Sequence, residues 1–381
     1  MTTTSPSDAG RIPERPPGIP VTLLTGFLGS GKTTLLNRLL HDPRLTDTAV
    51  IVNEFGEIGL DHHFVEASSA DMVVMNSGCL CCTVRGDLVD TMRRLYMQRV
   101  RGEVPQFRRV IIETTGLADP APILHTLMED PLLEAYYRLD GVVTTVDAVN
   151  GASQLDAQFE SVKQAAVADR IVLTKTDLAA SDRSKALQAR LGRLNPGAPV
   201  IVAVNGAADP SDLLETGLWN PETKIADVKR WLHEEAYSGH GHDHHDHSHE
   251  SDHGHGGRDQ DPHDVNRHDR RIRAHCLVVE EPLEWDAFAM WLGSLIRMRG
   301  EDMLRIKGVL NVKGEAGPIA LHGVQQVFHP PARLPEWPDD DRRSKLVFIT
   351  RDIERAFLER SLNAYRDATA APTTTPPTEN L

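Results

Sequence analysis

The feature that most constrains the fold is a glycine-rich segment near the N-terminus, residues 26–33, which read GFLGSGKT. It fits the pattern G-x-x-x-x-G-K-[S/T] without a mismatch, and it lies between an apolar run at 21–25 and a helical pattern at 34–40. Such a loop joins a buried strand to a helix whose first backbone N–H groups face an anion. The segment therefore predicts a phosphate-binding loop in an α/β sheet; a glycine-rich turn that binds nothing is the alternative.

The residues of this loop have separate expected roles. Lys32 would reach the β- and γ-phosphates, and the Thr33 hydroxyl would bind Mg²⁺. Glu113 ends the apolar run 110–114 and would bring a second acidic group to the Mg²⁺, with Gly116 able to approach the γ-phosphate. Capping of a following helix is the alternative role for Glu113. The other expected phosphate-binding residues are Gly26, Gly29, Ser30, Gly31 and Thr34.

Short β-branched runs alternate with helical stretches over the N-terminal half. Amphipathic patterns at 83–99 and 156–168 predict helices between the runs. Near-continuous apolar runs are typical of parallel strands covered on both faces, so we expect a doubly wound, mostly parallel sheet with flanking helices. The runs expected to be strands are 21–25, 48–52, 72–75, 110–114, 141–146, 170–174 and 200–204.

The composition changes abruptly after this half. Residues 240–269 are almost entirely His, Asp, Gly, Ser and Arg, and such a segment cannot bury apolar surface. Beyond it, strand patterns at 271–280, 303–312, 320–328 and 344–350 and helical patterns at 283–299 and 352–362 predict a small α+β domain. The expected order is a disordered N-terminal arm (1–19), an α/β domain that carries the phosphate loop (20–236), a His-rich disordered linker (237–269), the α+β domain (270–366) and a disordered tail (367–381).

A second motif indicates which base is bound. Thr174-Lys175-Thr176-Asp177 follows the run 170–174 and is close to the [N/T]-K-x-D pattern that reads guanine. Asp177 would accept from the guanine N1–H and N2–H₂, Lys175 would pack its stem on the ring, and Thr174 replaces the usual Asn. This predicts GTP as the nucleotide, with a solvated loop as the alternative. Asn205-Gly206 is a further candidate base-side loop.

Three of the four cysteines lie together in Gly78-Cys79-Leu80-Cys81-Cys82. Thiolates at a helix N-terminus have lowered pKa values, which favours metal capture, and three soft ligands suit Zn²⁺ or Cu(I). Redox chemistry by Cys79 and Cys81, or burial as inert thiols, are the alternatives. Cys276 stands alone in an apolar run and is expected to be core packing.

The segment Asn53-Glu54-Phe55-Gly56-Glu57 follows the second expected strand, where P-loop GTPases carry a segment that senses the γ-phosphate. Glu54 would serve Mg²⁺ or position water, and Glu57 is a further candidate; a charged exposed loop is the alternative. His62 and His63 are expected to be solvated rather than ligating.

Residues 240–268 contain ten histidines, mostly at every other position. Neighbouring imidazoles can chelate one ion weakly without any fold, which suits Zn²⁺, Ni²⁺, Co²⁺ or Cu²⁺. The segment is a candidate metal store that feeds the cysteines, and a linker with incidental affinity is the alternative. The accessory ligands we expect are His240, His242, His244, His245, His247 and His249.

The net charge and the distribution of apolar residues argue against several other classes of protein. The formal net charge of −14 argues against a general nucleic-acid or anionic-membrane binder. The sequence lacks a run of about 18 apolar residues, and its polar, proline-rich start is unlike a signal peptide. Clustered thiols favour a reducing compartment, so we expect a cytoplasmic protein.

Taken together, the motifs resemble those of the CobW-like metallochaperone GTPases, relatives of the nickel-delivery GTPases of hydrogenase and urease maturation. The resemblance covers roughly residues 20–365. The matching pieces occur in family order: GFLGSGKTTLLN at 26–37, NEFGE at 53–57, GCLCC at 78–82, ETTGLADP at 113–120, VDAV at 146–149 and TKTDL at 174–178.

The resemblance implies a GTPase that couples its nucleotide state to metal held by Cys79, Cys81 and Cys82 and delivers the metal to a client metalloprotein. Zn²⁺ is the expected cargo, with Co²⁺ or Ni²⁺ as alternatives, and a homodimer is compatible with this interpretation. The competing hypothesis is a metal buffer that uses the His-rich segment, with nucleotide binding mainly structural.

Overall fold

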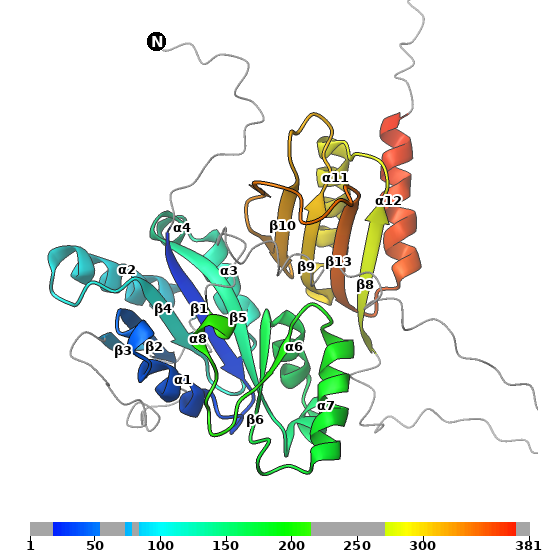
Figure 1. Cartoon of the computed structure of the whole chain (residues 1–381). Coiled ribbons are helices and arrows are strands. Elements are labelled where there is room, and N and C mark those ends of the chain that lie inside the picture. Colours follow the sequence, from blue (N-terminus) through cyan, green and yellow to red (C-terminus); the bar gives the residue numbers. More distant parts are fainter. Residues whose placement is uncertain (1–17, 54–72, 78–83, 215–270, 371–381) are drawn as a thin grey trace, which may run out of the picture.

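The computed structural model describes residues 18–53, 73–77, 84–214 and 271–370. In these ranges the chain forms two β-sheets, one in each half of the sequence, and helices pack on both (Figure 1). Glu54, Glu57, His62, His63, the cysteines 79, 81 and 82, and the His-rich segment lie outside the described residues.

The N-terminal sheet contains seven strands within the described residues, in the order β3-β2-β4-β1-β5-β6-β7. Every pair of neighbouring strands is parallel, so the C-terminal ends of the strands lie at the same edge of the sheet. This confirms the expected parallel α/β sheet. The strands are β1 (Ile19–Gly26), β2 (Thr48–Asn53), β3 (Val73–Ser77), β4 (Arg109–Glu113), β5 (Tyr137–Asp147), β6 (Arg170–Thr174) and β7 (Val200–Val202).

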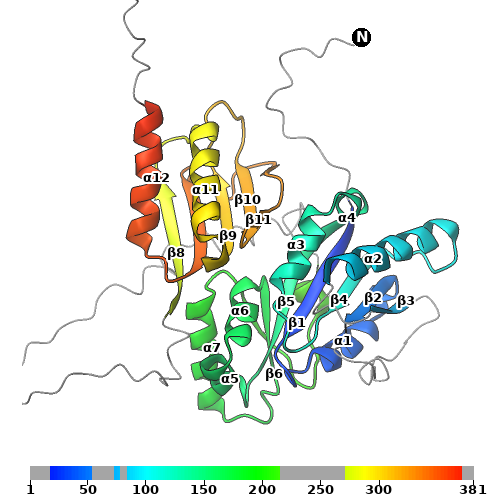
Figure 2. The same cartoon turned by 180° about the vertical axis from the view of Figure 1, so that it is seen from behind.

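Helices cover both faces of this sheet because its strands are apolar on both sides (Figure 2). Helix α1 (Lys32–Leu40) and the short α8 (Pro210–Leu213) pack on one face. The opposite face carries α2 (Val84–Arg101), α3 (Ala121–Glu129), α4 (Pro131–Tyr136), α5 (Gly151–Ala157), α6 (Phe159–Val167) and α7 (Ser181–Leu194). A short 3₁₀ helix, η2 (Pro43–Leu45), follows α1.

The C-terminal sheet is antiparallel and runs β11-β10-β9-β13-β8, with β12 paired to β10. One of its faces packs on α11 (Trp285–Arg299) and α12 (Arg355–Ala370) around the fully buried Trp291 and Phe348. The strands are β8 (Ile272–Val279), β9 (Met303–Leu310), β10 (Ile319–Val324), β11 (Val327–Phe328), β12 (Ala332–Arg333) and β13 (Ser344–Arg351), and η5 (Gly300–Asp302) precedes β9. The expected α+β domain is thereby confirmed.

The other face of the C-terminal sheet packs on the N-terminal domain, and one buried cluster includes residues of α6, α7, β8, β9 and β13. Cys276 belongs to this cluster and is buried, as expected for core packing. The contact is also ionic. Asp169, just before β6, accepts from Arg305 Nη2 at 2.6 Å and pairs with Lys307 Nζ at 2.7 Å. Its second oxygen accepts from the backbone N–H of Val142 at 2.9 Å.

Some expected element boundaries in the N-terminal half were wrong. The pattern at 156–168 is two helices, because Gln158 has an extended backbone between α5 and α6. Strand β5 begins at Tyr137, four residues before the expected 141, and β7 ends at Val202 rather than 204.

Some expected element boundaries in the C-terminal half were also wrong. The run 320–328 is a hairpin rather than one strand, since Gln325 has a φ of 52° and the chain reverses between β10 and β11. The last helix begins at Arg355 instead of 352 and continues through Ala370, so residues 367–370 do not belong to a disordered tail.

Candidate nucleotide site

The glycine-rich loop joins β1 to α1 at the carboxyl edge of the parallel sheet. Gly26, Gly29 and Gly31 have φ values of 144°, 69° and 90°, in the region that residues with a Cβ rarely adopt. Gly31 is the N-cap of α1, and Ser30 N–H donates to the Phe27 carbonyl at 3.1 Å. The loop therefore curves around the N-terminus of α1, where unpaired backbone N–H groups favour an anion.

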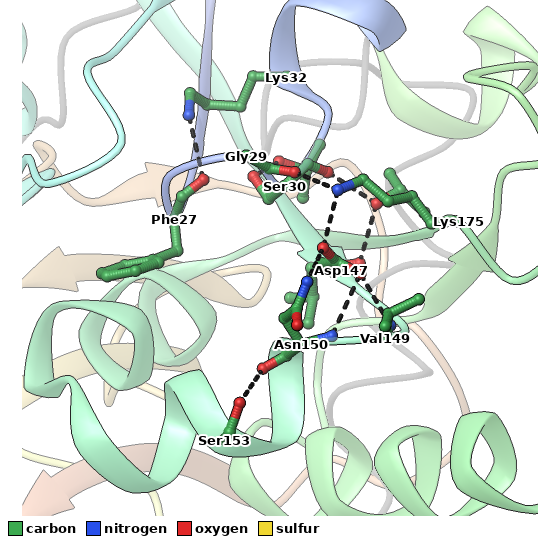
Figure 3. A network of polar contacts seen from close by, with 12 residues as sticks. Phe27, Gly29, Ser30, Lys32, Asp147, Val149, Asn150, Ser153 and Lys175 are labelled. Atoms are coloured by element: carbon green, nitrogen blue, oxygen red, sulfur yellow. Dashed lines mark hydrogen bonds and ion pairs between the residues drawn. The ribbon is translucent and has the colours of Figure 1, made fainter. Parts of the chain in front are cut away.

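Lys32 is the first residue of α1, and its side chain reaches back across the loop (Figure 3). Its Nζ donates to the carbonyls of Gly26 at 3.0 Å and Phe27 at 3.3 Å. The ammonium group thus lies over the hollow of the loop, where it can neutralise phosphate oxygens.

Thr33 and Glu113 lie together, although 80 residues separate them in the sequence. The Thr33 hydroxyl donates to Glu113 Oε1 at 2.7 Å, and Glu113 is only 4% exposed. Glu113 ends β4, the strand next to β1, so the sheet itself places the carboxylate beside the loop. The helix-capping alternative is not favoured, because the first turn of α3 uses Asp119, whose Oδ1 accepts from Ala121 N–H at 3.0 Å.

Gly116 follows β4 and approaches the phosphate loop closely. A Cβ on Gly116 would lie 2.6 Å from the backbone nitrogen of Leu28, so no other residue fits there without a shift. Gln164 of α6 holds this segment by donating from Nε2 to the carbonyls of Gly116 at 3.2 Å and Ala118 at 3.0 Å. Gly116 is therefore held directly against the phosphate loop.

The expected base-recognition residues follow β6, on the other side of the phosphate loop. The Thr174 hydroxyl donates to the Ser30 carbonyl at 2.7 Å, which joins the two loops directly. Lys175 has a left-handed backbone with φ of 56°, and its Nζ donates to the Gly29 carbonyl at 2.6 Å. Asp177 is exposed at the same edge, where it can meet a base.

Asp147, at the end of β5, is part of the same network, although no role for it follows from its sequence pattern. It is 1% exposed, and its Oδ2 accepts from Lys175 Nζ at 2.8 Å (Figure 3). Burial alone would raise the pKa of Asp147, but hydrogen bonds from Lys175, Asn150 and Val149 outweigh burial and lower that pKa. Two signals were available: an acidic residue ends the apolar run, and it lies in the matching segment VDAV at 146–149, beside the strand that precedes Lys175.

The Asn205-Gly206 turn lies beside α1. Gly206 has a φ of 73°, and a Cβ there would lie 3.0 Å from the Thr34 carbonyl oxygen. Arg38 of α1 donates from Nε to the Asn205 carbonyl at 3.3 Å. The turn is therefore next to the helix that begins at the phosphate loop, as a further base-side segment would need to be.

Of the expected metal ligands, Thr33 and Glu113 lie together at the phosphate loop, whereas Glu54, the cysteines 79, 81 and 82 and the histidines of 240–249 lie outside the described residues. Among the described residues, no group of three or more His, Cys, Asp or Glu side chains is arranged to hold a metal ion. The strand ends that flank the missing segments are described: Asn53 of β2 is the register partner of Ser77 of β3, and Val52 is the partner of Glu113. No helix in the described ranges is long and apolar enough to cross a membrane.

Comparison with known proteins agrees with this architecture. Residues 20–202 match the family model described as CobW/HypB/UreG, nucleotide-binding domain, and residues 272–366 match the cobalamin synthesis protein cobW C-terminal domain. The zinc chaperone YjiA of Escherichia coli K12 is 32% identical over 333 residues, which cover 87% of this chain and 93% of the relative. The zinc chaperone CobW of Sinorhizobium sp is 28% identical over 395 residues, covering 91% and 97%.

A solved structure extends the similarity to three dimensions. The crystal structure of the Zn(II)-bound YjiA GTPase from E. coli aligns with a TM-score of 0.63 at 27% identity, covering 92% of this chain and 99% of that one. The match includes both sheets, because it spans nearly the whole of each chain.

Proposed function

The chain belongs to the CobW/HypB/UreG family of P-loop GTPases, and we propose that it is a GTP-hydrolysing chaperone for a metal ion, most reasonably Zn²⁺. In this proposal the nucleotide state sets the affinity for the metal, and the metal passes to a client metalloprotein. One observation supports the nucleotide-binding part of this proposal. Three segments that are distant in the sequence meet around the N-terminus of α1: the phosphate loop, Glu113 and the Thr174–Lys175 turn.

The proposed nucleotide pose follows from that contact. The triphosphate lies along the loop with Lys32 on its β- and γ-phosphates, and guanine lies against Lys175 with its edge toward Asp177. Catalysis then depends on holding the phosphates and an attacking water in place and on neutralising charge, without a covalent intermediate. Glu54 is a candidate for positioning that water.

Mg²⁺ is the proposed companion of the nucleotide, and the donor set fits it. The Thr33 hydroxyl and the Glu113 carboxylate are hard oxygen donors 2.7 Å apart at the loop, which is the ligand chemistry that Mg²⁺ prefers. Bound there together with phosphate oxygens, it would supply charge neutralisation. Glu54 is a proposed third contributor.

The proposed metal cargo site is Cys79, Cys81 and Cys82, and the sheet topology supports its coupling to the nucleotide. Ser77, two residues before Cys79, is the register partner of Asn53, the residue before Glu54. Val52 in turn is the partner of Glu113, which contacts Thr33. Because parallel strands end at one edge, β2 and β3 both end on the side of the sheet that carries the phosphate loop.

The coupling is tested by measuring Zn²⁺ affinity with a non-hydrolysable GTP analogue and with GDP. We expect a difference of tenfold or more between the two states. A matched pair of variants assigns the site: Cys79→Ser should abolish the difference, whereas Cys276→Ser, in the buried interface, should retain it. Equal Zn²⁺ affinities in the two nucleotide states would refute the coupling.

The competing proposal is a metal buffer that uses the His-rich segment. Deletion of residues 240–268 separates the two. If the segment is an accessory store, the deletion lowers metal stoichiometry but keeps the nucleotide-dependent site. If nearly all metal binding disappears and Cys79→Ser has no effect, the buffer hypothesis is correct.

Delivery and location complete the proposal. Clustered thiolates need a reducing compartment, so we propose that the protein acts in the cytoplasm.

The client would be captured by Zn²⁺-loaded protein with the GTP analogue and released with GDP. Equal capture in both states would argue against GTP-controlled delivery.

A further inference from the structure

Asp147 makes more polar contacts than its position at a strand end requires. It ends β5, where Asp147 and Thr174 are register partners, and its side chain is 1% exposed. Oδ1 accepts from the backbone N–H groups of Val149 at 2.7 Å and Asn150 at 3.3 Å. Oδ2 accepts from Asn150 Nδ2 at 3.0 Å and from Lys175 Nζ at 2.8 Å.

Lys175 is thereby held at two points. Its Nζ donates to the Gly29 carbonyl of the phosphate loop as well as to Asp147, while the side chain keeps 35% exposure (Figure 3). An exposed lysine normally samples many rotamers, and fixing it costs side-chain entropy. Here the hydrogen bond to the buried Asp147 carboxylate already restricts the Lys175 side chain in the nucleotide-free protein. The aliphatic part of the side chain is therefore held in one position before the nucleotide binds.

The backbone of Lys175 also needs support. Its φ of 56° is uncommon for a residue with a long side chain and persists only where several contacts fix it. Thr174, just before it, bonds to the Ser30 and Val146 carbonyls, and the Ala148 N–H donates to the Thr174 carbonyl at 2.9 Å. The ends of β5 and β6 and the phosphate loop therefore form one rigid unit with Asp147 at its centre.

We propose that Asp147 is a positioning residue for guanine recognition: it holds Lys175 against the phosphate loop in the pose that receives the base. The inference rests on the proposed function, since it assigns Asp147 to the same nucleotide site. The hydrogen bonds of Asp147 go to Val149, Asn150 and Lys175 and not to the proposed phosphate and Mg²⁺ residues, so we expect its removal to weaken nucleotide binding more than turnover.

A carboxylate is required because both of its oxygens accept. An asparagine at 147 must turn its NH₂ either toward the Val149 N–H or toward the Lys175 ammonium, and both of those are donors. It also removes the negative charge that holds Lys175. Asp147→Asn is therefore a nearly isosteric test of the proposed role.

The test compares Asp147→Asn, Lys175→Met and the double variant for GTP affinity and hydrolysis. We expect each single variant to raise the Kd for GTP about tenfold and to change kcat less than threefold. Because both act through one ion pair, the double variant should bind no more weakly than the weaker single variant. Asp147→Glu, which keeps the charge, should recover part of the affinity.

The control is Asp130→Asn at the N-cap of α4, where a carboxylate likewise accepts from two backbone N–H groups but lies away from the site. It should leave GTP affinity unchanged, and circular dichroism melts should show all variants folded. If Asp147→Asn does not fold, the comparison of Lys175→Met and Asp147→Glu decides: wild-type affinity in both overturns the proposal.

Three other outcomes would overturn the proposal, and they differ in whether they also refute the proposed function. Unchanged GTP affinity in Asp147→Asn, or fully additive effects in the double variant, would refute the positioning role alone. Wild-type protein that does not prefer GTP to ATP would refute the guanine assignment in the proposed function together with this inference.

Discussion

Removal of the buried Asp169 carboxylate is expected to destabilise the domain interface strongly. The Asp169 side chain is 8% exposed and faces Arg305 and Lys307, whose side chains are 3% and 14% exposed. Burial alone would raise the pKa of Asp169, but the charges of Arg305 and Lys307 outweigh burial and hold that pKa well below the usual range. The carboxylate is therefore ionised at neutral pH, and its negative charge offsets two buried cations.

Replacing Asp169 by Asn removes that charge with little change in shape. Breaking a buried ion pair by removing one partner costs about 3–5 kcal/mol, since the remaining charges are left uncompensated. The amide cannot avoid the loss, because the two carboxylate oxygens accept from opposite donors, Arg305 on one side and the Val142 N–H on the other. We expect a loss of about 4 kcal/mol, a large part of a typical unfolding free energy of 5–15 kcal/mol.

Urea unfolding followed by tryptophan fluorescence measures this loss. With a slope of about 3 kcal/mol/M, the midpoint should fall by about 1–2 M. The matched control is Glu359→Gln, which breaks the exposed Arg355–Glu359 pair of α12 and should cost about 0.3–0.5 kcal/mol. Adding Lys307→Met to Asp169→Asn should recover stability, because it removes one unpaired cation. A shift no larger than that of Glu359→Gln would refute the argument.

Four further predictions concern the site and the core. Glu113→Gln should lower kcat for GTP hydrolysis about 10²-fold in a phosphate-release assay, and unchanged turnover would exclude its proposed role. Gly116→Ala should raise the Kd for a fluorescent GTP analogue at least tenfold, because its Cβ would lie 2.6 Å from Leu28 N; wild-type affinity would show that the loop tolerates the contact. Asn195→Ala should lower the free energy of unfolding in urea by about 1–3 kcal/mol, because Asn195 Nδ2 donates to carbonyls at the end of α6 that would lose their donor. A smaller loss would show that water donates to these carbonyls instead. Burial, followed by the charge of Arg305, lowers the pKa of His322 well below 6.5, so the unfolded chain binds a proton that the folded chain does not. Stability should therefore fall from pH 7.5 to 5.5, by at most about 1.4 kcal/mol per pH unit for this proton, and a His322→Gln variant with the same slope would contradict this.

The sequence was sufficient for the parallel sheet because the phosphate-loop motif requires a strand, a turn and a helix in fixed order. Thr33 and Glu113 meet as expected, since both follow from strand ends that the sheet brings together. The start of β5 was missed because residues 137–140 read YRLD, a polar pattern for a strand. Two of its polar side chains make contacts with distant parts of the chain: Tyr137 donates to the Met92 carbonyl, and Asp140 accepts from Thr22.

Asp147 and Asp169 could not be assigned from sequence for a related reason. Each is an acidic residue beside an apolar run, a pattern equally typical of a solvated loop. Their roles depend on side chains that are distant in the sequence: Lys175, which follows β6, is 28 residues away from Asp147, and Arg305 of β9 is 136 residues away from Asp169. Pairings of this kind follow from three-dimensional packing and leave no periodic signal in the chain.

The packing of the two domains has a consequence for the segment that joins them. Their relative position is set by the buried cluster between α6, α7 and the C-terminal sheet, together with the contacts of Asp169. Because these contacts lie within the described residues, the arrangement of the domains does not depend on a particular length or composition of residues 215–270. Insertions, deletions or a changed histidine content there can therefore accumulate during evolution without altering how the domains fit.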